Sequence, residues 1–525
     1  MSVAEVPPGA SGPETFGIDP DVHARRWWIL ASLCLSLVMI VVAISSLNVA
    51  LPEIQRALDA SGTELSWLID AYALVFAGVL LPAGALGDRF GRRGALQFGL
   101  VVFGLAVLAA SAAEDPSQLI AARVVMGVGA AFIMPATLSI IIHSFPFHER
   151  PKAIALWAGF AGVGGALGPI SSGLLLENFW WGAIFFVNVP LVAVLLLLSW
   201  RILPTSKDPS GHPLDLVGAG LAMTGLVSLV FAVIEGPEQG WLDPVTVGAF
   251  VAAVVLLVGF VRWELRHETP MLDPRLFRMP GFAGGSAAVT LAFFSMFSMF
   301  FLLTQYLQFV KGYSALGAGL RVLPNALSLV LIAPQAPRIV GRFGVRRAMR
   351  TGFLLTAVAF ALLATADRSS PDLLVLVAMT CTGAGMGLLM PGASQHIVGS
   401  LPMAKAGVGS AVNDVTREVG GALGIAVTGS VVATVFRASD FESVIPATDA
   451  RQVAGESVGQ ALGVARGALD GGFIERAEFD ALVAAAADAF NDGTRIAFAL
   501  LAVVAVVAGL VISRVIPDQL PSRDH

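Results

Sequence analysis

Four ionisable residues lie inside long apolar stretches of the sequence and could take part in proton transfer. Arg123 lies in one stretch, and Asp414, Arg417 and Glu418 lie in another. A charge inside a lipid-spanning helix is costly and rarely idle. Arg417 and Glu418 follow Asp414 by three and four residues, so a helix would place the trio on one face. We interpret the trio as a candidate proton relay, in which an acid binds a proton and an approaching arginine favours its release.

A structural interpretation of the same trio stays open. Asp414 lies about eight residues inside the expected start of its helix, or roughly 12 Å at 1.5 Å per residue. The trio could therefore be an ion cluster that joins this helix to the loop containing Asp88. Asp70 and Glu235 are further candidates for proton entry or coupling, near the ends of their expected helices. For Glu235, exposure at the water interface is the simpler explanation.

The elements that must hold these residues are membrane helices. The chain of 525 residues is 56% hydrophobic and only 13% charged, with a mean hydropathy of +0.80, whereas a soluble chain would be about a quarter charged. Apolar runs long enough to cross roughly 30 Å of hydrocarbon recur along the sequence. They predict fourteen transmembrane helices at about 27–48, 66–86, 95–113, 117–142, 153–176, 182–200, 214–234, 244–262, 281–309, 315–337, 348–366, 371–399, 406–436 and 495–515.

The positions of arginine and lysine predict the orientation. If the leader 1–26 lies inside, the alternating loops that share its side hold twenty-one basic residues, against three in the short opposite loops. Short loops rich in these residues stay cytoplasmic, so both termini, including the tail 516–525, are expected inside. The long loop 437–494 is then outside. Its latter part has apolar residues at helical spacing, which predicts a helix on the membrane surface or over an outer mouth, although an insertion without a direct role is the simpler explanation.

Internal repeats predict how the helices are grouped. The stretch 163–168 recurs unchanged as 419–424, at an offset of 256, and the stretch Met126 to Pro135 is echoed at the same offset. Arg89-Phe90-Gly91 is echoed by Arg342-Phe343-Gly344 at an offset of 253. We therefore expect an all-α membrane protein with two parallel six-helix bundles, 27–201 and 281–515, and with two inserted helices and a linker over 202–280. Parallel six-helix halves are typical of major facilitator transporters.

The sequence resembles this superfamily in detail. The expected second inner loop, 84–93, is similar to the superfamily signature in its residues Gly84, Asp88, Arg89, Gly91, Arg92 and Arg93. The segments 48–52, 67–72, 235–241 and 306–324 resemble the fourteen-helix drug:proton antiporter family, the EmrB/QacA type. The resemblance implies that Asp88 docks on the start of the helix near 406 and stabilises the outward-facing state. It also implies a role for Arg123 in proton translocation, although its counterpart in the second repeat is Met379.

A glycine strip in the fifth expected helix favours export over uptake. Gly164, Gly168 and Gly173 follow one another at short spacing, which lets helices pack closely. Pro169 interrupts the hydrogen-bond ladder and predicts a kink. The set is similar to the motif that distinguishes exporters from symporters in the superfamily.

The candidate substrate cavity is polar but neutral. Related antiporters often carry an aspartate at the position of Ala43, so the usual acid of the first helix is missing here. The remaining candidates to line a cavity are Ser45, Asn48, Phe297, Gln305, Gln308, Gln395 and His396. Together with the abundant Phe and Met around 293–301, they favour a lipophilic substrate that is neutral or weakly charged.

These observations predict proton-coupled efflux of lipophilic small molecules by alternating access, in the manner of a multidrug antiporter of a bacterial cytoplasmic membrane. A dedicated exporter of an endogenous metabolite or lipid is the alternative. An enzyme is not expected, because the histidines form no ligand-spaced pair and no nucleophile–base set stands out. No lysine follows a glycine, so a phosphate loop is excluded. We expect no metal, no cofactor beyond the proton gradient, no nucleic-acid partner and a monomer surrounded by lipid.

Overall fold

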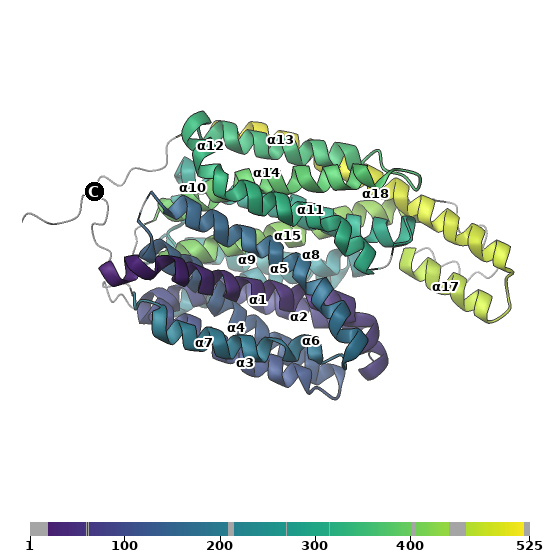
Figure 1. Cartoon of the computed structure of the whole chain (residues 1–525), viewed down its shortest axis with the longest axis horizontal. Coiled ribbons are helices and arrows are strands. Elements are labelled where there is room, and N and C mark those ends of the chain that lie inside the picture. The colour runs from purple at the N-terminus through teal and green to yellow at the C-terminus, as the bar shows by residue number, and fades with distance from the viewer. Residues whose placement is uncertain are drawn as a thin grey trace, which may run out of the picture.

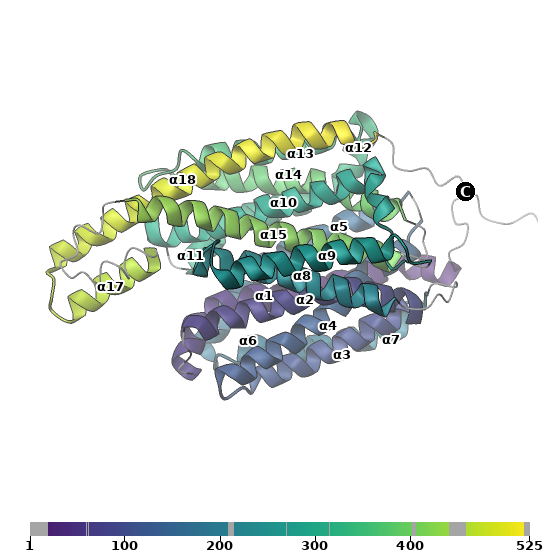
Figure 2. The ribbon, with the colours of Figure 1, turned by 180° about the vertical axis from the view of Figure 1, so that it is seen from behind.

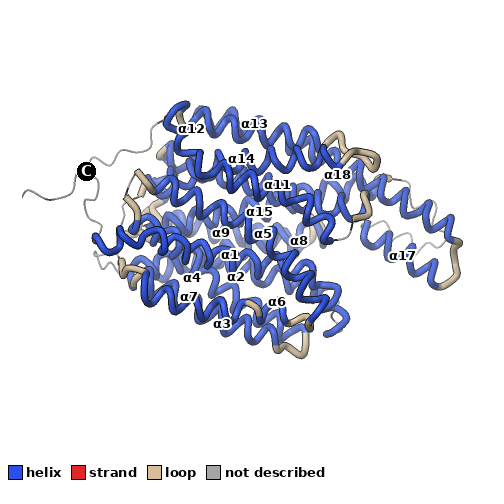
Figure 3. Tube along the Cα trace, in the orientation of Figure 1, coloured by secondary structure: helices blue, strands red, loops and turns tan. Residues whose placement is uncertain are grey.

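The computed structural model describes residues 19–58, 60, 62–146, 148–207, 215–268, 270–313, 315–401, 406–439 and 458–518. Within these residues every regular element is a helix, as the tube in Figure 3 shows. Most of these helices run roughly along one direction and are joined by short turns (Figure 1). The expected all-α architecture is therefore confirmed for the described chain.

The first half of the chain forms one bundle. Its last span is made of two helices in succession, α6 and α7. Gly91, with φ of 117°, separates α2 from α3 in a conformation that side chains with a Cβ rarely adopt. The helices are α1 (Pro20–Leu58), α2 (Gly62–Phe90), α3 (Arg92–Ser111), α4 (Pro116–Ser144), α5 (Arg150–Asn178), α6 (Ala183–Phe186) and α7 (Asn188–Ile202).

The inserted pair and the second bundle follow. The inserted helices are α8 (Leu216–Gln239) and α9 (Pro244–Glu264). In the second bundle, α10 continues into a short π-helical segment, η2, and α11 continues through η3 into α12. The elements are η1 (Pro274–Arg278), α10 (Pro280–Gln305), η2 (Tyr306–Val310), α11 (Ala315–Ile332), η3 (Ala333–Gln335), α12 (Ala336–Phe343), α13 (Val345–Leu363), α14 (Asp372–Gly399), α15 (Ala406–Arg437), α17 (Val458–Asp470) and α18 (Arg476–Val515).

The predicted set of fourteen membrane helices is present in the described chain. Thirteen helical segments are long and apolar enough to cross a membrane. The remaining one is α13, of 19 residues, whose first two turns carry Arg346, Arg347 and Arg350. Because these arginines cluster at one end, the rest of α13 is apolar, and it packs between α14 and α18. The protein is therefore a multi-pass membrane protein.

Close backbone contacts confirm the internal repeat. A Cβ on Gly99 of α3 would lie 2.7 Å from the carbonyl oxygen of Gly129 in α4. At the equivalent place in the second bundle, a Cβ on Gly352 of α13 would lie 2.7 Å from the carbonyl oxygen of Gly385 in α14. The packing of α1 on α5 is likewise repeated by α10 on α15. The same glycine-dependent contacts thus build both bundles.

The inserted helices lie between the two bundles. Figure 2 shows α8 and α9 between α10 and α15 on one side and α2 and α4 on the other. α8 packs on α2 of the first bundle and also on α15 of the second. Direct contacts between the bundles are made by α2 and α4 with α15, and by α5 with α11 and α14.

The chain outside the bundles differs from the expectation. The last helix does not begin near residue 495: α18 begins at Arg476 and runs without interruption for 40 residues. The expected surface helix is therefore the extension of α18, which projects beyond the bundle and packs against α17 (Figure 1). The extension is not a separate helix because its buried residues Leu482, Ala486 and Phe490 belong to the same apolar core as Phe498 of the membrane span. Within the loop 437–494, residues 440–457 lie outside the described chain.

The first and last segments also shift in their boundaries. α1 begins at Pro20, so the end of the expected leader 1–26 is already helical. The tail 516–525 is described only to residue 518. Asp518 accepts a hydrogen bond from the backbone N–H of Arg346 at 3.2 Å, which places the start of the tail beside the start of α13.

Substitution of Gly99 tests the backbone contact between α3 and α4. Gly99→Ala is expected to lower the free energy of unfolding by about 1–3 kcal/mol, because the methyl group would overlap the backbone of α4. Gly94→Ala in the same helix is the matched control, since a Cβ there meets no atom within 4 Å. The measurement is thermal unfolding in detergent, and equal transition temperatures for the two variants would contradict the packing described.

Candidate functional site

Asp88 joins the two bundles at one end of the molecule. It lies near the end of α2, and its Oδ2 accepts a hydrogen bond from the backbone N–H of Val408, at the start of α15, at 3.0 Å. Its Oδ1 accepts from Nε of Arg92 at 2.8 Å. The first backbone N–H groups of a helix lack intrahelical acceptors and carry a positive partial charge, so a buried carboxylate is a fitting cap. This contact lies where the sequence resemblance places it.

The arginines of the same loop are anchored within the first bundle. Arg92 is buried and also contacts the ring nitrogens of His143 in α4, the nearer at 2.7 Å. Arg93 donates to the carbonyl oxygen of Trp200 at the end of α7, at 2.7 Å. Arg89 lies over the ring of Phe90 at 5.4 Å. Gly84 and Gly87 are buried in the last turns of α2, where a Cβ on Gly87 would lie 3.2 Å from the Cβ of Ala95.

A separate ion pair fixes the start of α1 at the same end. Nε of Arg26 donates to Oε2 of Glu149 at 2.6 Å, just before α5 begins. The hydrogen bond from the Arg26 guanidinium holds the pKa of Glu149 below its usual range. Glu149 is therefore ionised at neutral pH and keeps α1 and α5 in register.

Arg417 lies between aromatic rings from both bundles. Its guanidinium is 4.6 Å from the ring centroid of Phe293 in α10 and 5.7 Å from that of Trp157 in α5. Its Nη1 is 3.3 Å from Oδ1 of Asp414, one turn earlier on α15. Cation–π contacts are stronger where water is excluded, and Trp157 is fully buried. Arg417 thus ties the acid-bearing face of α15 to α5 of the opposite bundle.

Asp414 is buried in a polar network between α14 and α15. Ser394 donates to Oδ1 of Asn413 at 2.8 Å, and the amide of Asn413 contacts Oδ1 of Asp414 at 3.5 Å. Oδ2 of Asp414 has no hydrogen-bond partner among the described residues. A buried carboxylate with one uncompensated oxygen is an expensive arrangement, which a bound proton would relieve.

Arg123 lies against α2 in the interior of the first bundle. Its Nε donates to the carbonyl oxygen of Leu68 at 2.8 Å, and its guanidinium lies 4.5 Å from the ring centroid of Tyr72. Its Nη1 has no hydrogen-bond partner in the described chain. Glu418 of α15 is partly buried. Arg123 thus lies between α4 and α2, the two helices of the first bundle that pack on the acid-bearing α15.

The two remaining acid candidates are Asp70 and Glu235. Asp70 is partly buried on α2. Glu235 is partly buried near the end of α8 and accepts a hydrogen bond from Gln239, one turn later on the same helix. A local contact of this kind needs no role in proton transfer.

The exporter-like motif forms the contact between α1 and α5. A Cβ on Gly164 would lie 2.9 Å from Cβ of Val41, and Gly168 faces Ser45 directly. The hydroxyl of Ser46 donates to the carbonyl oxygen of Gly168 at 3.2 Å. In the opposite direction, the hydroxyl of Ser172 donates to the carbonyl oxygen of Ser46 at 2.9 Å. Gly173 meets no atom within 4 Å. The side chains of Pro169 and Asn48 lie outside the described residues.

The candidate cavity residues do not gather at one place. Ser45 lies in the α1–α5 contact, and its hydroxyl donates to Val41 at 2.8 Å. Gln305 ends α10 and donates to the carbonyl oxygen of Phe301 at 3.2 Å, and Gln308 lies in the following η2. Gln395 and His396 lie near the opposite end, where His396 faces Gly281 at the start of α10. Phe297 packs between them on Gly421 of α15.

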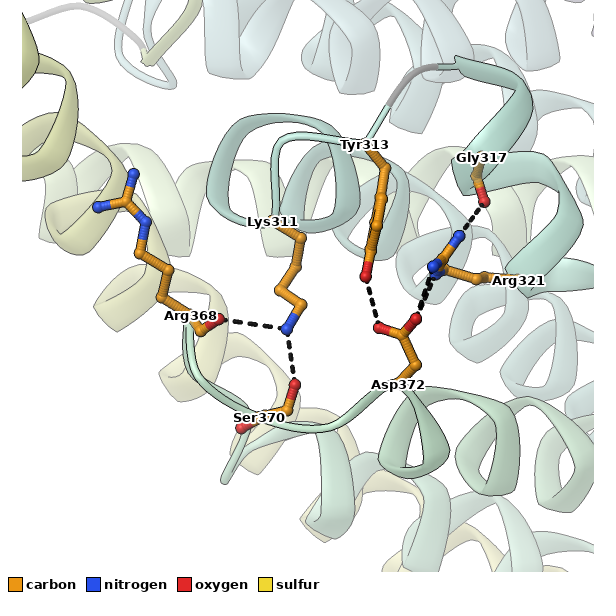
Figure 4. Close-up of polar contacts among 7 residues, drawn as sticks. All are labelled: Lys311, Tyr313, Gly317, Arg321, Arg368, Ser370 and Asp372. Carbon is orange, nitrogen blue, oxygen red and sulfur yellow. Dashed lines mark hydrogen bonds and ion pairs between the residues drawn. The ribbon is translucent and has the colours of Figure 1, made fainter.

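A polar cluster that sequence reasoning missed lies at the end of the second bundle that is remote from Asp88 (Figure 4). Arg321 of α11 donates through Nε to Asp372 at 2.9 Å and stacks on Tyr313 at 3.5 Å, and the hydroxyl of Tyr313 also donates to Asp372, at 2.8 Å. Lys311 donates to the carbonyl oxygen of Ser370 at 2.6 Å. The cluster joins three segments of a single bundle. An arginine two turns inside an expected helix was the available signal.

Tyr72, Trp157 and Phe293 were also missed as neighbours of the buried charges. They are ordinary aromatic residues in apolar runs, and only their positions opposite Arg123 and Arg417 distinguish them. The structure thus places Arg123 and the charged trio on helices that pack against each other, and it places an inter-bundle cap at one end of α15.

Comparison with known proteins agrees with this geometry. Residues 33–425 match the profile of the Major Facilitator Superfamily. The chain belongs to this superfamily. Two solved structures share the fold: the human organic anion transporter MFSD10 (TM-score 0.62, 15% identity, 94% of this chain and 100% of that one) and a double Trp mutant of XylE (0.62, 14%, 95% and 97%).

Several members of the superfamily are similar to this chain over most of its length. The multidrug efflux pump LfrA of Mycolicibacterium smegmatis is 36% identical, covering 84% of this chain and 88% of its own. The methyl viologen resistance protein SmvA of Salmonella typhimurium is 35% identical, with 79% and 84% covered. The puromycin resistance protein pur8 of Streptomyces alboniger is 36% identical, with 79% and 82% covered.

Removal of the Asp88 carboxylate should weaken the cap between the bundles. Asp88→Ala deletes a charge-assisted hydrogen bond worth about 1.5–3 kcal/mol, so the population with separated ends should rise roughly tenfold or more. The readout is the distance distribution between spin labels at Phe90 and Phe343, which are exposed near this end. Cys34 and Cys381 are replaced by serine in this background.

Asp372→Ala is the matched control, because it removes an acid at the remote end of the second bundle. It should leave the label distances unchanged. An unaltered distance distribution in Asp88→Ala would contradict the assignment of Asp88 as an inter-bundle cap.

Proposed function

We propose that this superfamily member is a proton-coupled exporter of lipophilic small molecules that works by alternating access. The observation that carries the proposal is the position of Asp414, Arg417 and Glu418, whose helix contacts both the second bundle and, through Trp157, the first. Charges at a moving interface can couple proton binding to rearrangement, whereas charges inside one bundle cannot do so directly. The names of LfrA and SmvA, an efflux pump and a resistance protein, support the export direction.

In this proposal the state described here faces outward. The cap of Asp88 on Val408 holds the bundles together at its own end, and that end is the cytoplasmic one if the distribution of arginine and lysine sets the orientation. Protons enter from the remote end and bind an acid of α15. Loss of the negative charge at Asp414 releases Arg417 from its ion pair and prepares the release of the cap.

The proton gradient is sufficient for this work. Moving one elementary charge across roughly 150 mV supplies about 3.5 kcal/mol. That free energy corresponds to a concentration ratio of a few hundredfold for a neutral substrate. One proton for each substrate molecule therefore suffices.

The proposed substrates are lipophilic, since the second bundle offers a Phe- and Met-rich surface along α10 and no acid replaces Ala43 of α1. Cations are not excluded as substrates, because SmvA is named for resistance to methyl viologen. A dedicated exporter of an endogenous product is the less favoured alternative. Competition between chemically unrelated substrates separates the two, since a multidrug exporter is inhibited by many of them.

The setting follows from the same proposal. We place the protein in a bacterial cytoplasmic membrane with both termini inside, as a monomer surrounded by lipid. No enzyme activity, metal, nucleic-acid partner or organic cofactor is part of the mechanism. The proton is the only co-substrate.

The relay is tested by efflux from energised vesicles. Proton-driven accumulation of puromycin should collapse on addition of a protonophore, and should fall by roughly tenfold or more, or about 1.4 kcal/mol, in Asp414→Asn, Glu418→Gln and Arg123→Ala. Each substitution removes a charge at or facing the bundle interface. Glu235→Gln is the matched control, because that acid makes a local contact on α8.

Undiminished coupling in all three variants would contradict the relay. Accumulation that survives the protonophore would contradict proton coupling altogether. Failure to accumulate puromycin in the wild type would contradict the proposed substrate class.

A further inference from the structure

Three arginines at one end of the second bundle have no acceptor in the described chain. Arg347 and Arg350 lie in the first two turns of α13, and Arg514 lies in the last turn of α18. All three residues are exposed, and their guanidinium groups form no hydrogen bond or ion pair with a described residue. The two helices are neighbours here, since a Cβ on Gly509 of α18 would lie 3.6 Å from the carbonyl oxygen of Arg350. Exposed cations thus gather where α13 begins and α18 ends.

The packing of α13 on α18 uses a different arginine. Nε of Arg346 donates to the carbonyl oxygen of Ile516, directly after α18, at 2.7 Å. The first bundle has the same kind of contact at an offset of 253, where Arg93 donates to the carbonyl oxygen of Trp200 near the end of α7. Asp518 accepts a hydrogen bond from the backbone N–H of Arg346 and forms no ion pair with a described arginine. Arg346 therefore belongs to the repeated scaffold.

Arg347 and Arg350 have no counterpart in that scaffold. At the same offset the first bundle has Gly94 and Gln97. The amide of Gln97 donates to the hydroxyl of Ser199 in α7 at 3.1 Å, and a Cβ on Gly94 would meet no atom within 4 Å. Neither position needs a cation for the helices to pack. The two arginines are thus an addition of the second bundle.

Orientation in the membrane does not require such unmatched charge. At the end of α9, which also contributes to the excess of basic residues on this side, Arg262 and Arg266 alternate with Glu264 and Glu268. The first two turns of α13 hold three arginines and no acid. The helix dipole favours acids and not cations at the start of a helix, so helix stability does not explain the arginines either. Their charge is available to an anion from outside the protein.

The surface that continues from these arginines into the membrane span is apolar. On α13, exposed apolar residues follow Arg350 at intervals of four, and on α18 they precede Arg514 at helical spacing, so each arginine shares a face with them. These residues, each at least 40% exposed, are Leu354 and Val358 of α13 and Val507, Leu510 and Val511 of α18. Both helices lie along the outer edge of the bundle (Figures 1 and 2). In a membrane this edge contacts acyl chains.

We propose that Arg347, Arg350 and Arg514 form a binding site for the phosphate diester of an anionic phospholipid. Guanidinium groups bind phosphate oxygens through paired N–H donors, and basic clusters beside the cytoplasmic ends of membrane helices attract anionic lipids. A free phosphate offers the same anionic chemistry, but only a lipid also covers the apolar residues of α13 and α18. The bound lipid joins the start of α13 to the end of α18. The site contains neither the Asp88 cap nor the trio of α15, so it does not depend on the proposed function.

The test is the thermal stability of the full chain in detergent, titrated with lipid. Phosphatidylglycerol should raise the unfolding transition temperature, and the titration gives its apparent dissociation constant. In the double variant Arg347→Gln, Arg350→Gln this constant should increase roughly tenfold or more, because two guanidinium groups at the headgroup are lost. Phosphatidylcholine with the same acyl chains lacks the net charge, and inorganic phosphate lacks the chains, so neither should reproduce the rise.

The matched control is the double variant Arg262→Gln, Arg266→Gln. It removes the same charge from the same side of the molecule, at a place where acids accompany the arginines, and it should bind phosphatidylglycerol within twofold of the wild type. A second double variant, Arg347→Lys with Arg350→Lys, keeps the charge but loses the paired donors. Its dissociation constant should lie between those of the wild type and the glutamine variant. Without lipid, all variants should unfold at the wild-type temperature, since the replaced side chains are exposed.

The outcomes decide between a specific site and a general effect of charge. Unchanged binding in the glutamine variant of α13, or an equal loss in the α9 control, overturns the site. A rise of the same size with inorganic phosphate alone overturns its assignment to a lipid. If the glutamine variant does not fold, wild-type affinity in the lysine variant overturns the recognition by arginine. Lipid binding is measured here without transport, so none of these outcomes bears on proton-coupled export.

Discussion

Charges buried among lipid-spanning helices must be compensated by groups on the protein, because hydrocarbon provides neither counter-charges nor hydrogen-bond partners. This constraint governs the arrangement of the interior. Arg417 is compensated by Asp414 and by the rings of Phe293 and Trp157, and Arg123 by the carbonyl oxygen of Leu68 and the ring of Tyr72. In neither set is compensation complete, since Asp414, Arg417 and Arg123 each retain an unpaired polar atom within the described chain. A bound proton or a rearrangement of the helices would satisfy these unpaired atoms.

The internal repeat separates what builds the fold from what serves transport. Glycines 99 and 129 in one bundle, and 352 and 385 in the other, make the same backbone contacts, so these positions are set by packing. The buried charge of Arg123 does not repeat: Met379 stands in its place. A duplicated scaffold that keeps its contacts but varies its polar residues can place a cation in one half and the acids in the other. Such asymmetry is what a coupled interface requires.

Hydropathy and charge predicted the helices, and short sequence matches predicted the repeat, because each depends on local composition or spacing. The contact of Asp88 was implied by the resemblance of its loop to the superfamily signature. They did not predict that the last helix begins at Arg476, since the amphipathic face of its extension looks like a surface helix until its continuity with the apolar span is known. The candidate cavity residues Gln305 and His396 proved to lie at opposite ends, and the aromatic partners of the buried arginines stayed hidden among similar residues. Distances between bundles are set by tertiary packing, which no local pattern contains.

The inserted helices add a constraint on how the bundles move. α8 lies against α2 so closely that a Cβ on Gly78 would be 2.6 Å from Val227 and 3.2 Å from the carbonyl oxygen of Met223. Surfaces packed at this distance cannot slide without opening voids or overlapping. Against the second bundle, the end of the inserted hairpin is held by a hydrogen bond from Trp241 to Ser430 of α15, at 2.9 Å, in an exposed position. One such bond is worth only about 0.5–1.5 kcal/mol. The inserted pair is therefore held more closely by α2 than by this one hydrogen bond to α15, although α8 also packs directly on α15.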